Sequence, residues 1–491
     1  MKKITEMIQE RVRRPIKVIQ FGEGNFLRAF VDDMIDIANE KGVMDAGIAV
    51  VKPIPFGSLE SFKKQECLYT VNLRGKQDGK VVNDSRIITS VEQVVGCYED
   101  FDEYLALAKL DTLEFVVSNT TEAGIVLDVT DSMDSIPNTY PGKLTQFLYT
   151  RYAAFDGNPE KGLTILPVEL IEHNGRKLKE CVLALAEAWK LPENFKSWIE
   201  GSCTFCSTLV DRIVTGYPKE EAGKICEKLG YEDELLDVAE PFGLWIIESD
   251  RDISRQFPLH KAGLPVIFTD NQKPFRERKV RILNGAHTST VLLGWLSGLG
   301  CVRECMEDSV VRAFMEAAVK EEIMPFVKLP KEQVEQFANA VFERFENPFI
   351  YHKLLDISLN SVSKWKTRVL PSVKDYYEER KQLPMMLVFS FSALLAFYTS
   401  DILEDGVLQA VREDGTQYPV RDDSSVLNFM QKYSRKSVDR YVTAVAEHTE
   451  FWGENLSGYE GFVKAAEEGL NDIRTLGAKA AAEKWLREKE R

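Results

Sequence analysis

Three side chains within one short stretch, Lys279, Asn284 and His287, are of the types that move protons beside a carbonyl group. The apolar residues between them are typical of a partly buried helix. At about 100° per residue, Asn284 and His287 share a helix face, and Lys279 lies roughly 80° from His287 and 140° from Asn284. One wall of a cleft could therefore receive an amine, an amide that donates to an oxyanion, and an imidazole. The alternative is a surface lysine, a helix-interior asparagine and a core histidine.

A glycine turn near the N-terminus could hold the phosphates of a nucleotide. The apolar run 17–21 is followed by Gly22 and Gly24 and then by a helical pattern. Strand, glycine turn and helix together present backbone N–H groups and a helix N-terminus to a pyrophosphate. The match to a full dinucleotide motif is partial, because Leu27 stands where a third small residue is expected. Arg28 could meet phosphate directly; the alternative is a turn that only connects two elements.

Two further predicted strands end in polar residues. Residues 47–51 lead to Lys52, where an NAD-binding sheet usually carries an acidic residue for the ribose hydroxyls, so the basic side chain leaves NADP open. Residues 113–118 lead into a polar loop, and loops at the carboxyl ends of parallel strands are where open α/β sheets bind ligands. Unless they are ordinary turn residues, three residues are expected to line the nicotinamide side: Thr120, Thr121 and Glu122.

The chain of 491 residues exceeds what a single hydrophobic core supports, so two domains are expected. Residues 1–270 contain strand patterns separated by helical ones, which predicts an α/β class with a Rossmann-type dinucleotide-binding sheet. From residue 271 the patterns are mostly helical, so residues 271–491 are predicted to form a helical substrate-binding and catalytic domain. The Lys279 helix would begin this second domain and face the first across a cleft.

The net charge of −15 argues against a nucleic-acid or anionic-membrane partner, because both favour basic surfaces. No secretory signal is visible before the first strand, and the longest apolar run, residues 385–398, is too short to span a bilayer. A cytoplasmic protein is therefore expected, with no particular oligomeric state predicted. Two cysteine pairs, Cys203 with Cys206 and Cys301 with Cys305, have no histidine close to them and are interpreted as reduced core residues rather than metal ligands.

Four motifs taken together resemble the long-chain polyol (mannitol-type) dehydrogenase family. They are Phe21-Gly-Glu-Gly-Asn-Phe-Leu-Arg-Ala29, Asn119-Thr-Thr-Glu-Ala-Gly124, Val210-Asp-Arg212 and Lys279-x4-Asn284-x2-His287. The resemblance covers nearly the whole chain. It implies a Rossmann-type domain followed by a largely helical one, and NAD(P)-dependent interconversion of a sugar-derived ketone and alcohol without a metal ion.

The resemblance also implies roles for individual residues. Lys279 would be the general acid/base, Asn284 an oxyanion donor and His287 a substrate contact. The cofactor would be NAD, held by the glycine turn, the second strand and the polar loop: Gly22, Gly24, Asn25, Phe26, Arg28, Lys52, Asn119, Thr120, Thr121 and Glu122. The substrate would contact a second set: Glu169, Asp211, Arg276, Arg368 and Lys374.

Within the family, three further motifs look most similar to the hexuronate reductases. They are Ile165-Leu-Pro167-x-Glu169-Leu-Ile-x-x-Asn174-Gly175, Arg281-Ile-Leu-Asn-Gly-Ala-His-Thr288 and Leu359-Asn-Ser-Val-Ser-Lys-Trp365. This similarity implies a sugar-acid substrate and NADH-dependent interconversion of D-tagaturonate and D-altronate. The alternatives are fructuronate reduction, a neutral polyol such as mannitol, or a nucleotide-sensing protein on an enzyme scaffold. An intact Lys/Asn/His set argues against a pure binder, which needs no proton donor.

The chain departs from the mannitol-type pattern at two places. Val168-Glu169-Leu170 stands where those members carry Cys-Asp-Asn, so one oxyanion amide is lost. Arg276 stands where they carry a glutamate three residues before the catalytic lysine. A basic residue there suits an acidic substrate, and either Arg276 or the run Lys364-Trp-Lys-Thr-Arg368 is expected to pair with its carboxylate. The alternative is that these are solvated helix charges.

Overall fold

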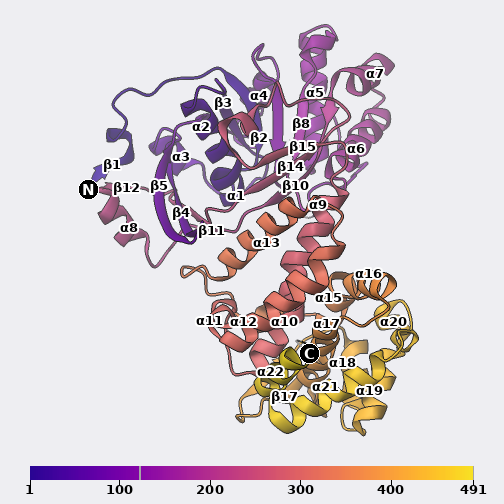
Figure 1. Cartoon of the computed structure of the whole chain (residues 1–491). Helices are drawn as coiled ribbons and strands as arrows, with labels where there is room; N and C mark the ends of the chain where they lie inside the picture. The colour runs from indigo at the N-terminus through magenta and orange to yellow at the C-terminus, as the bar shows by residue number, and fades with distance from the viewer. Residues whose placement is uncertain (121–122, 490–491) are drawn as a thin grey trace. The chain divides into compact units, whose positions relative to one another are not determined.

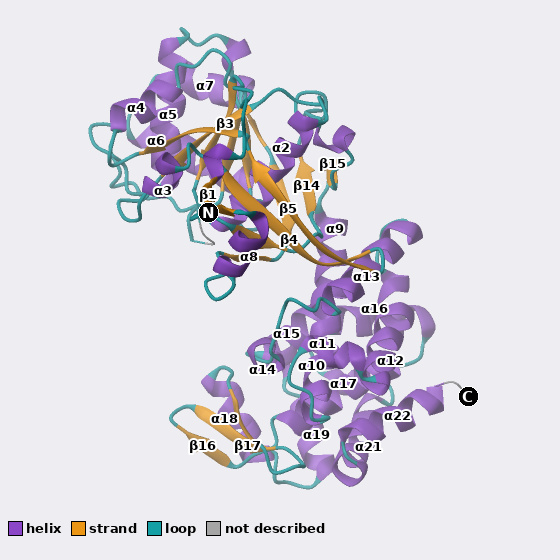
Figure 2. Cartoon of the chain, turned by 90° about the vertical axis from the view of Figure 1, so that its left-hand side faces the viewer, coloured by secondary structure: helices purple, strands orange, loops and turns teal. Residues whose placement is uncertain are grey.

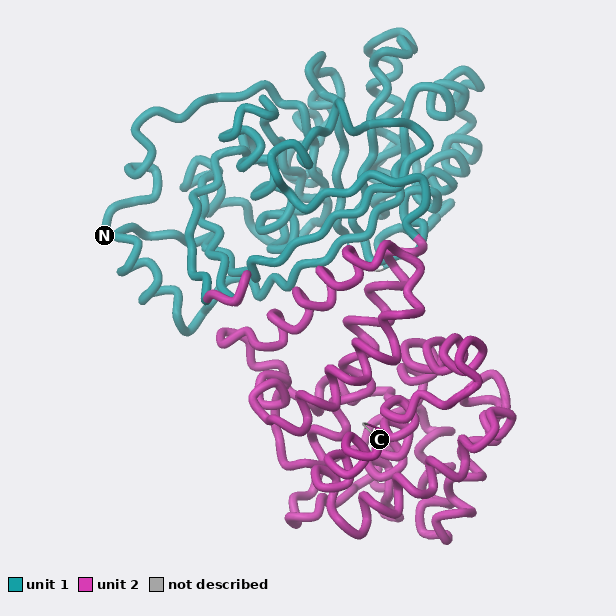
Figure 3. The backbone as a smooth tube through the Cα atoms, viewed as in Figure 1, with its two compact units in different colours: residues 1–75, 81–272 teal, residues 76–80, 273–491 magenta. Residues whose placement is uncertain are grey.

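The computed structural model describes residues 1–120 and 123–489, and the chain divides into two compact units (Figure 3). Unit 1 comprises residues 1–75 and 81–272, and unit 2 comprises residues 76–80 and 273–491. Segment 76–80, which the sequence places within the first domain, is the turn of a β-hairpin. In unit 2, Glu343 accepts hydrogen bonds from the backbone amides of Asp78 (3.0 Å) and Gly79 (2.6 Å).

A six-stranded parallel sheet is the centre of unit 1 (Figure 1). Its order is β6-β3-β2-β7-β8-β9, with bounds β2 Ile16–Phe21, β3 Gly47–Lys52, β6 Val91–Gly96, β7 Phe115–Ser118, β8 Thr164–Pro167 and β9 Thr204–Phe205. Counted along the chain, this is the order 3-2-1-4-5-6 of a Rossmann sheet. The order reverses between β2 and β7, and ligands bind outside the carboxyl ends of the strands at such a reversal.

Apolar layers cover both faces of this sheet, as a parallel sheet requires. Alternate residues of each strand point to opposite sides: Ile48 and Val50 of β3 join one core cluster, while Ala49 and Val51 join the other. The first cluster includes residues of the helix over residues 25–40, made of α1 Asn25–Leu27, the π-helical segment η2 Arg28–Asp32 and α2 Asp33–Glu40. Four helices supply the second cluster: α4 Phe101–Leu107, α5 Tyr140–Ala154, α6 Asn174–Ala188 and α7 Glu193–Ser202.

Three smaller sheets complete unit 1, and Figure 2 shows their strands in orange. One is β10 Ser207–Asp211, β14 Leu244–Glu248 and β15 Val266–Thr269; another is β11 Val214–Gly216, β13 Asp237–Ala239, β4 Tyr69–Gln77 and β5 Lys80–Ile88; the third is β1 Lys2–Lys3 with β12 Tyr231–Glu232. The remaining helical turns are η1 Ile4–Glu6, α3 Glu60–Lys64, η3 Pro159–Lys161, α8 Ala222–Leu229 and η4 Leu259–Ala262.

Unit 2 is largely helical and begins with one continuous helix over residues 273–296. This helix consists of α9 Lys273–Arg278, the π-helical segment η5 Lys279–Asn284 and α10 Gly285–Leu296. The others are α11 Val302–Glu307, α12 Ser309–Ala317, η6 Ala318–Ile323, η7 Met324–Phe326, α13 Lys331–Phe345, α14 Leu354–Ile357, α15 Ser361–Arg368, α16 Leu370–Arg380, α17 Met385–Phe397, α18 Ser424–Tyr433, α19 Val438–Ala446, α20 Thr449–Trp452, η8 Leu456–Gly458, α21 Phe462–Leu476 and α22 Ala478–Lys489.

The apolar helix α17 lies at the centre of unit 2, where it packs against α10 and α21. Within the described residues, no helix combines the length and the apolar character that crossing a membrane requires. Unit 2 also contains an antiparallel sheet, β16 Ile402–Glu404, β17 Val407–Val411 and β18 Gln417–Val420, which the helical patterns of the sequence did not indicate. Its strands have 3–5 residues, too few for an alternation of apolar and polar positions to stand out.

Two glycines of unit 1 are expected to respond oppositely to substitution by alanine. A Cβ atom on Gly175, at the start of α6, would lie 2.0 Å from the backbone oxygen of Cys206, whereas one on Gly201 in α7 meets nothing within 4 Å. Gly175→Ala should therefore lower the free energy of unfolding by about 1–3 kcal/mol or more. Gly201→Ala should leave it unchanged or raise it by up to about 1 kcal/mol. Urea unfolding of both variants tests this, and equal stabilities would contradict it.

Candidate active site

The glycine turn joins β2 to the helix that follows it and lies beside the loop after β7. Gly22 has a φ of +120°, and a Cβ atom there would come within 3.1 Å of the Asn119 backbone oxygen, so glycine is required for both reasons. Gly24 precedes the first helical residue, Asn25, and a Cβ atom there would meet nothing within 4 Å. Open space beside backbone amides at a helix N-terminus is what a pyrophosphate needs, so the turn fits a dinucleotide.

A hollow of about 420 Å³ opens at this point of unit 1. It lies at the carboxyl ends of β2 and β7, where the strand order reverses. Its described lining residues are Gly22, Glu23, Gly24, Pro53, Ile54, Asn119, Thr120, Ala123, Gly124, Val126, Asn138, Thr139 and Tyr140. Four residues predicted to bind the cofactor are thus brought together: Gly22, Gly24, Asn119 and Thr120. The predicted Thr121 and Glu122 lie outside the described residues.

Arg28 is buried rather than directed into this hollow. Its guanidinium donates to the Asn25 side chain at 2.5 Å and to the Leu235 backbone oxygen, and lies 3.6 Å from the Asp237 carboxylate. It also lies over the Tyr69 ring, 5.2 Å from the centroid. This set of partners favours a structural role for Arg28, which anchors the start of the helix to β4 and β13, and disfavours direct contact with phosphate.

Phe26 is also part of the packing around this helix. Its ring stacks on Phe30 with centroids 5.0 Å apart, and it packs against the core on that face of the sheet. Arg212 follows the predicted substrate residue Asp211 at the end of β10. Its guanidinium donates a hydrogen bond of 2.9 Å to the Asp33 carboxylate. Asp211 itself is buried. Buried ion pairs therefore hold this helix at Arg28 and at Asp33.

In unit 2, the π-helical turn changes the relative positions of the catalytic candidates. The backbone amide of Gly285 donates to the Val280 oxygen, a bond that spans five residues instead of four. Because one such turn holds an extra residue, Lys279 and Asn284 lie closer to one side of the helix than the α-helical angle of about 140° predicts. Both side chains are half-buried. Turns of this kind occur frequently at functional sites.

His287 lies one turn further along the same helix, inside a group of basic side chains. Its ring stacks on Phe345 with centroids 4.3 Å apart and meets His352 edge-on at 5.4 Å. Its Nε2 atom is buried and has no hydrogen-bond partner in the described part of the chain. Burial holds the pKa of His287 well below its ordinary value, and His352, Arg344, Arg368 and Lys364 lower the pKa further. The neutral imidazole is therefore the stable form.

Two cations on helix α15, Lys364 and Arg368, differ in whether a protein group binds them. Lys364 donates to the Ile357 oxygen at 2.8 Å. Arg368, one turn later on the same face, has no acidic partner among the described residues, and burial lowers its pKa. A Cβ atom on Gly285 would lie 3.3 Å from the Arg368 backbone oxygen, so this glycine lets α15 approach the Asn284–His287 turn closely. The result is a half-buried unpaired cation close to His287.

Two other predicted substrate residues of unit 2, Lys374 and Arg276, do not appear among the groups that act on His287. Lys374 on α16 pairs with the Glu454 carboxylate, which leaves its charge neutralised. Arg276, on α9, lies before the π-helical turn and is half-buried. Of the basic candidates, Arg368 and Lys364 are those that share the surroundings of His287.

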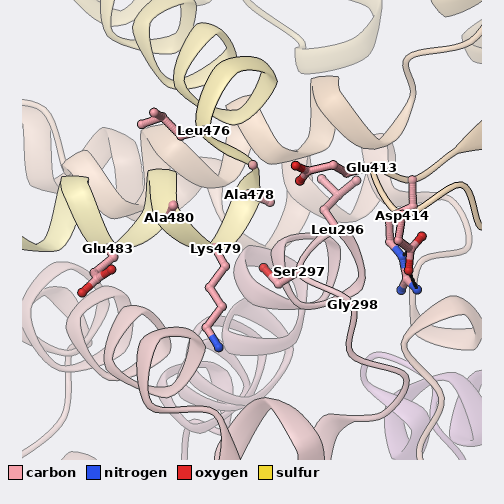
Figure 4. A pocket seen from close by; sticks show the side chains of 12 residues that line it. Leu296, Ser297, Gly298, Glu413, Asp414, Leu476, Ala478, Lys479, Ala480 and Glu483 are labelled. Carbon is pink, nitrogen blue, oxygen red and sulfur yellow. Dashed lines mark hydrogen bonds and ion pairs between the residues drawn. The ribbon is translucent and has the colours of Figure 1, made fainter.

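A second hollow in unit 2, of about 700 Å³, is larger but has different chemistry (Figure 4). It is lined by the end of α10, the turn after β17 and the start of α22. Both cations that line it are paired, Arg412 with Asp414 and Lys479 with Asp308. We therefore place no anion site there. Within residues 1–120 and 123–489, no group of three or more His, Cys, Asp or Glu side chains is arranged to hold a metal ion.

Two family models match the chain. One described as the mannitol dehydrogenase Rossmann domain covers residues 16–260, and one described as the mannitol dehydrogenase C-terminal domain covers residues 271–474. The chain belongs to the mannitol dehydrogenase family. The predicted resemblance and the predicted α/β fold class are thereby confirmed, and the protein is an oxidoreductase that acts on CH–OH groups.

Curated relatives extend over nearly the full length of this mannitol dehydrogenase family member. An altronate oxidoreductase of Yersinia enterocolitica is 42% identical over 95% of this chain and 96% of its own, and one of Pectobacterium carotovorum is 42% identical over 96% and 97%. Among solved structures, a substrate-free D-sorbitol dehydrogenase has a TM-score of 0.80 at 22% identity, with 98% of this chain and 99% of its own covered. Mannitol 2-dehydrogenase of Pseudomonas fluorescens has a TM-score of 0.64 at 20% identity, with 97% and 95% covered. These two structures share the fold.

Sequence reasoning missed part of the hollow in this mannitol dehydrogenase fold. Asn138, Thr139 and Tyr140 lie at the start of helix α5, where Thr139 is the N-cap and its side chain accepts a hydrogen bond from the Gly142 amide at 3.0 Å. The signal was present, because threonine followed by proline within two residues is typical of a helix start. Nothing local in the sequence, however, showed that this helix start reaches the glycine turn.

Glu169, predicted to contact substrate, forms hydrogen bonds with Thr120 in the wall of the hollow. Its carboxylate accepts hydrogen bonds from the Thr120 amide and hydroxyl, both at 3.1 Å, and from the Ser118 hydroxyl at 3.2 Å. It is 2% exposed. Burial raises its pKa from 4.5 to about 7, and these hydrogen bonds oppose that rise. Glu169 therefore fixes the loop after β7 that carries Asn119 and Thr120.

The raised pKa of Glu169 predicts a pH-dependent stability difference from Glu169→Gln. The folded protein holds this proton more tightly than the unfolded chain, so Glu169 stabilises the fold most below about pH 4.5 and loses that contribution as pH rises to about 7. The variant lacks this titration. Its free energy of unfolding relative to the unmodified protein should rise between about pH 5 and pH 8, by up to roughly 3 kcal/mol. Urea titrations of both proteins at several pH values test this. A difference in free energy of unfolding that stays constant with pH would contradict it.

Proposed function

We propose that this protein is an NADH-dependent hexuronate reductase that interconverts D-tagaturonate and D-altronate. The observation that carries the proposal is the half-buried cation Arg368 close to His287, in a chain whose net charge is −15. A local basic site in an acidic protein attracts an anionic substrate such as a sugar acid. The altronate oxidoreductases that are 42% identical over nearly the whole chain support the same substrate class.

Unit 1 would hold the dinucleotide at the hollow beside the glycine turn. Gly22 and Gly24 would place backbone amides against the pyrophosphate, and Asn119 and Thr120 would line the nicotinamide side. The solved mannitol 2-dehydrogenase, which shares the fold, is a ternary complex with NAD and D-mannitol, and this supports a nicotinamide cofactor. When bound, the reduced nicotinamide supplies the hydride that reduces the ketone carbon.

Unit 2 would supply the groups that act on the substrate oxygen. As negative charge grows on that oxygen, the Asn284 amide donates a hydrogen bond to it and the Lys279 ammonium gives it a proton. The π-helical turn supports this division of roles, because it brings these two side chains toward one side of the helix. The neutral His287 would contact a substrate hydroxyl through its unpartnered Nε2 atom. No metal ion takes part in these roles.

The substrate carboxylate would bind Arg368, with Lys364 close by. A guanidinium can hold a carboxylate through two parallel hydrogen bonds, and such charge-assisted bonds are stronger when partly removed from water. The pairing of Lys374 with Glu454 favours Arg368 over Lys374 for this role. A neutral polyol would leave the Arg368 charge uncompensated, which disfavours it as substrate.

Initial rates of NADH oxidation with tagaturonate, fructuronate and fructose test the proposal. We expect tagaturonate to give the highest kcat/KM, with turnover that survives treatment with a chelator. Lys279→Met should lower kcat by at least about 10²-fold because the proton donor is removed, while the variant still binds NADH. A preference for fructose or fructuronate, or no turnover of any of the three, would overturn the proposed substrate. Full activity of Lys279→Met would overturn the role of Lys279 as proton donor.

Substitutions within α15 test the carboxylate contact. Arg368→Gln should raise KM for tagaturonate by roughly 10–100-fold, because a charged hydrogen-bond pair is lost, and should change KM for a neutral ketose much less. Lys366→Gln is the matched control, since Lys366 lies toward Gly453 rather than toward His287. Equal effects of Arg368→Gln on charged and neutral substrates, or equal effects of the two variants on tagaturonate, would remove Arg368 from this role.

A further inference from the structure

The residue that ends the second strand of the Rossmann sheet is basic, whereas an acidic residue is usual at this position in NAD-binding proteins. At this position an acidic side chain normally binds the ribose hydroxyls of NAD, whereas a nearby cation accommodates the 2′-phosphate of NADP. This chain has Lys52 there. The sequence taken alone therefore leaves a site for NADP open.

The Lys52 ammonium is occupied within the protein. The side chain is fully buried, and Nζ donates to the backbone oxygens of Phe56 (3.3 Å) and Gly57 (3.1 Å). It also forms an ion pair with Glu99, whose side chain is 49% exposed. Lys52 thus holds the loop 53–57 in place, and its charge is compensated before any ligand binds.

A carboxylate stands in the same hollow, supplied by a different element. Glu23 lies between the two glycines of the turn and lines the hollow with Pro53 and Ile54, the two residues that follow Lys52. Its Oε1 atom is 4.0 Å from the position of a Cβ atom on Gly57, so the carboxylate faces the loop that Lys52 holds.

The electrostatics of Glu23 place it in the same group of charges. Burial raises the pKa of Glu23, Lys52 opposes the rise and Glu99 adds to it, which is what charges within interacting distance do. Arg28 also lowers the pKa of Glu23, but Arg28 is paired with Asp237 as Lys52 is with Glu99, so neither ion pair neutralises the Glu23 carboxylate.

We propose that Glu23 is the acidic residue that binds the adenosine ribose hydroxyls, and that Glu23 and Glu99 together exclude a 2′-phosphate. This inference rests on the proposed function, because it requires a dinucleotide in the hollow of unit 1. A neutral diol can donate both hydroxyl protons to the Glu23 carboxylate. A 2′-phosphate cannot, and it would place up to two further negative charges beside Glu23 and Glu99, with Lys52 already paired.

Equilibrium binding, measured without substrate, tests the assignment. Titrations of the unmodified protein with NADH and NADPH should give at least tenfold tighter binding of NADH, and 5′-ADP should bind more tightly than 2′,5′-ADP. Glu23→Gln should weaken NADH and strengthen NADPH, so that the ratio of the two dissociation constants moves by roughly tenfold or more. The double variant Glu23→Gln/Glu99→Gln should move the ratio further toward NADPH.

Glu114→Gln is the matched control. Glu114 precedes β7 at the opposite edge of the same sheet, where it pairs with Lys17 at 3.1 Å, and its loss should leave the ratio unchanged. A ratio that stays within twofold of the unmodified protein in Glu23→Gln would overturn the assignment, as would equal binding of 5′-ADP and 2′,5′-ADP to the unmodified protein. If neither NADH nor NADPH binds the unmodified protein, the proposed function is overturned instead. The two failures are therefore distinguishable.

Discussion

Both faces of the parallel sheet of unit 1 are covered by apolar side chains, and this burial limits where polar chemistry can take place. Strands such as β3 place alternate residues in two separate cores, so no polar ligand can be received on either face. In sheets of this kind, ligands bind at the loops of the carboxyl edge. At the reversal between β2 and β7, the positive φ of Gly22 and its contact with Asn119 keep two of these loops together and open the hollow beside them.

Several charged residues near this hollow serve its construction. Arg28 spans from the first helix to Asp237, Lys52 fixes the loop after β3, and Glu169 fixes the loop after β7. Each is buried, and each would destabilise the fold if its partners were removed, because an unpaired buried charge is costly. The groups left to meet a ligand are the backbone amides of the turn, the polar loop residues and Glu23. The proposed ribose contact follows from this distribution of charges.

In unit 2, the corresponding constraint is the departure from α-helical geometry at residues 279–284. A straight α-helix would separate Lys279 and Asn284 around its circumference, and the five-residue turn reduces this separation. Gly285 then admits the backbone of α15, which brings Arg368 toward His287. A helix register and a close helix contact therefore bring these side chains together.

The sequence by itself determined the fold class, the glycine turn and the Lys279–His287 helix, because these depend on local periodicity and on residue types a few positions apart. It also supported the family, since the motifs occur in order along the chain. Tertiary structure alone decided which charges pair in the interior. Arg28, Lys52 and Glu169 form ion pairs or hydrogen bonds with residues 47 to 209 positions away or in loops whose path no local pattern reveals. A charged side chain has the same sequence signature whether it binds a ligand or pairs in the core. The difference lies in its distance from other charges, which only the folded chain sets.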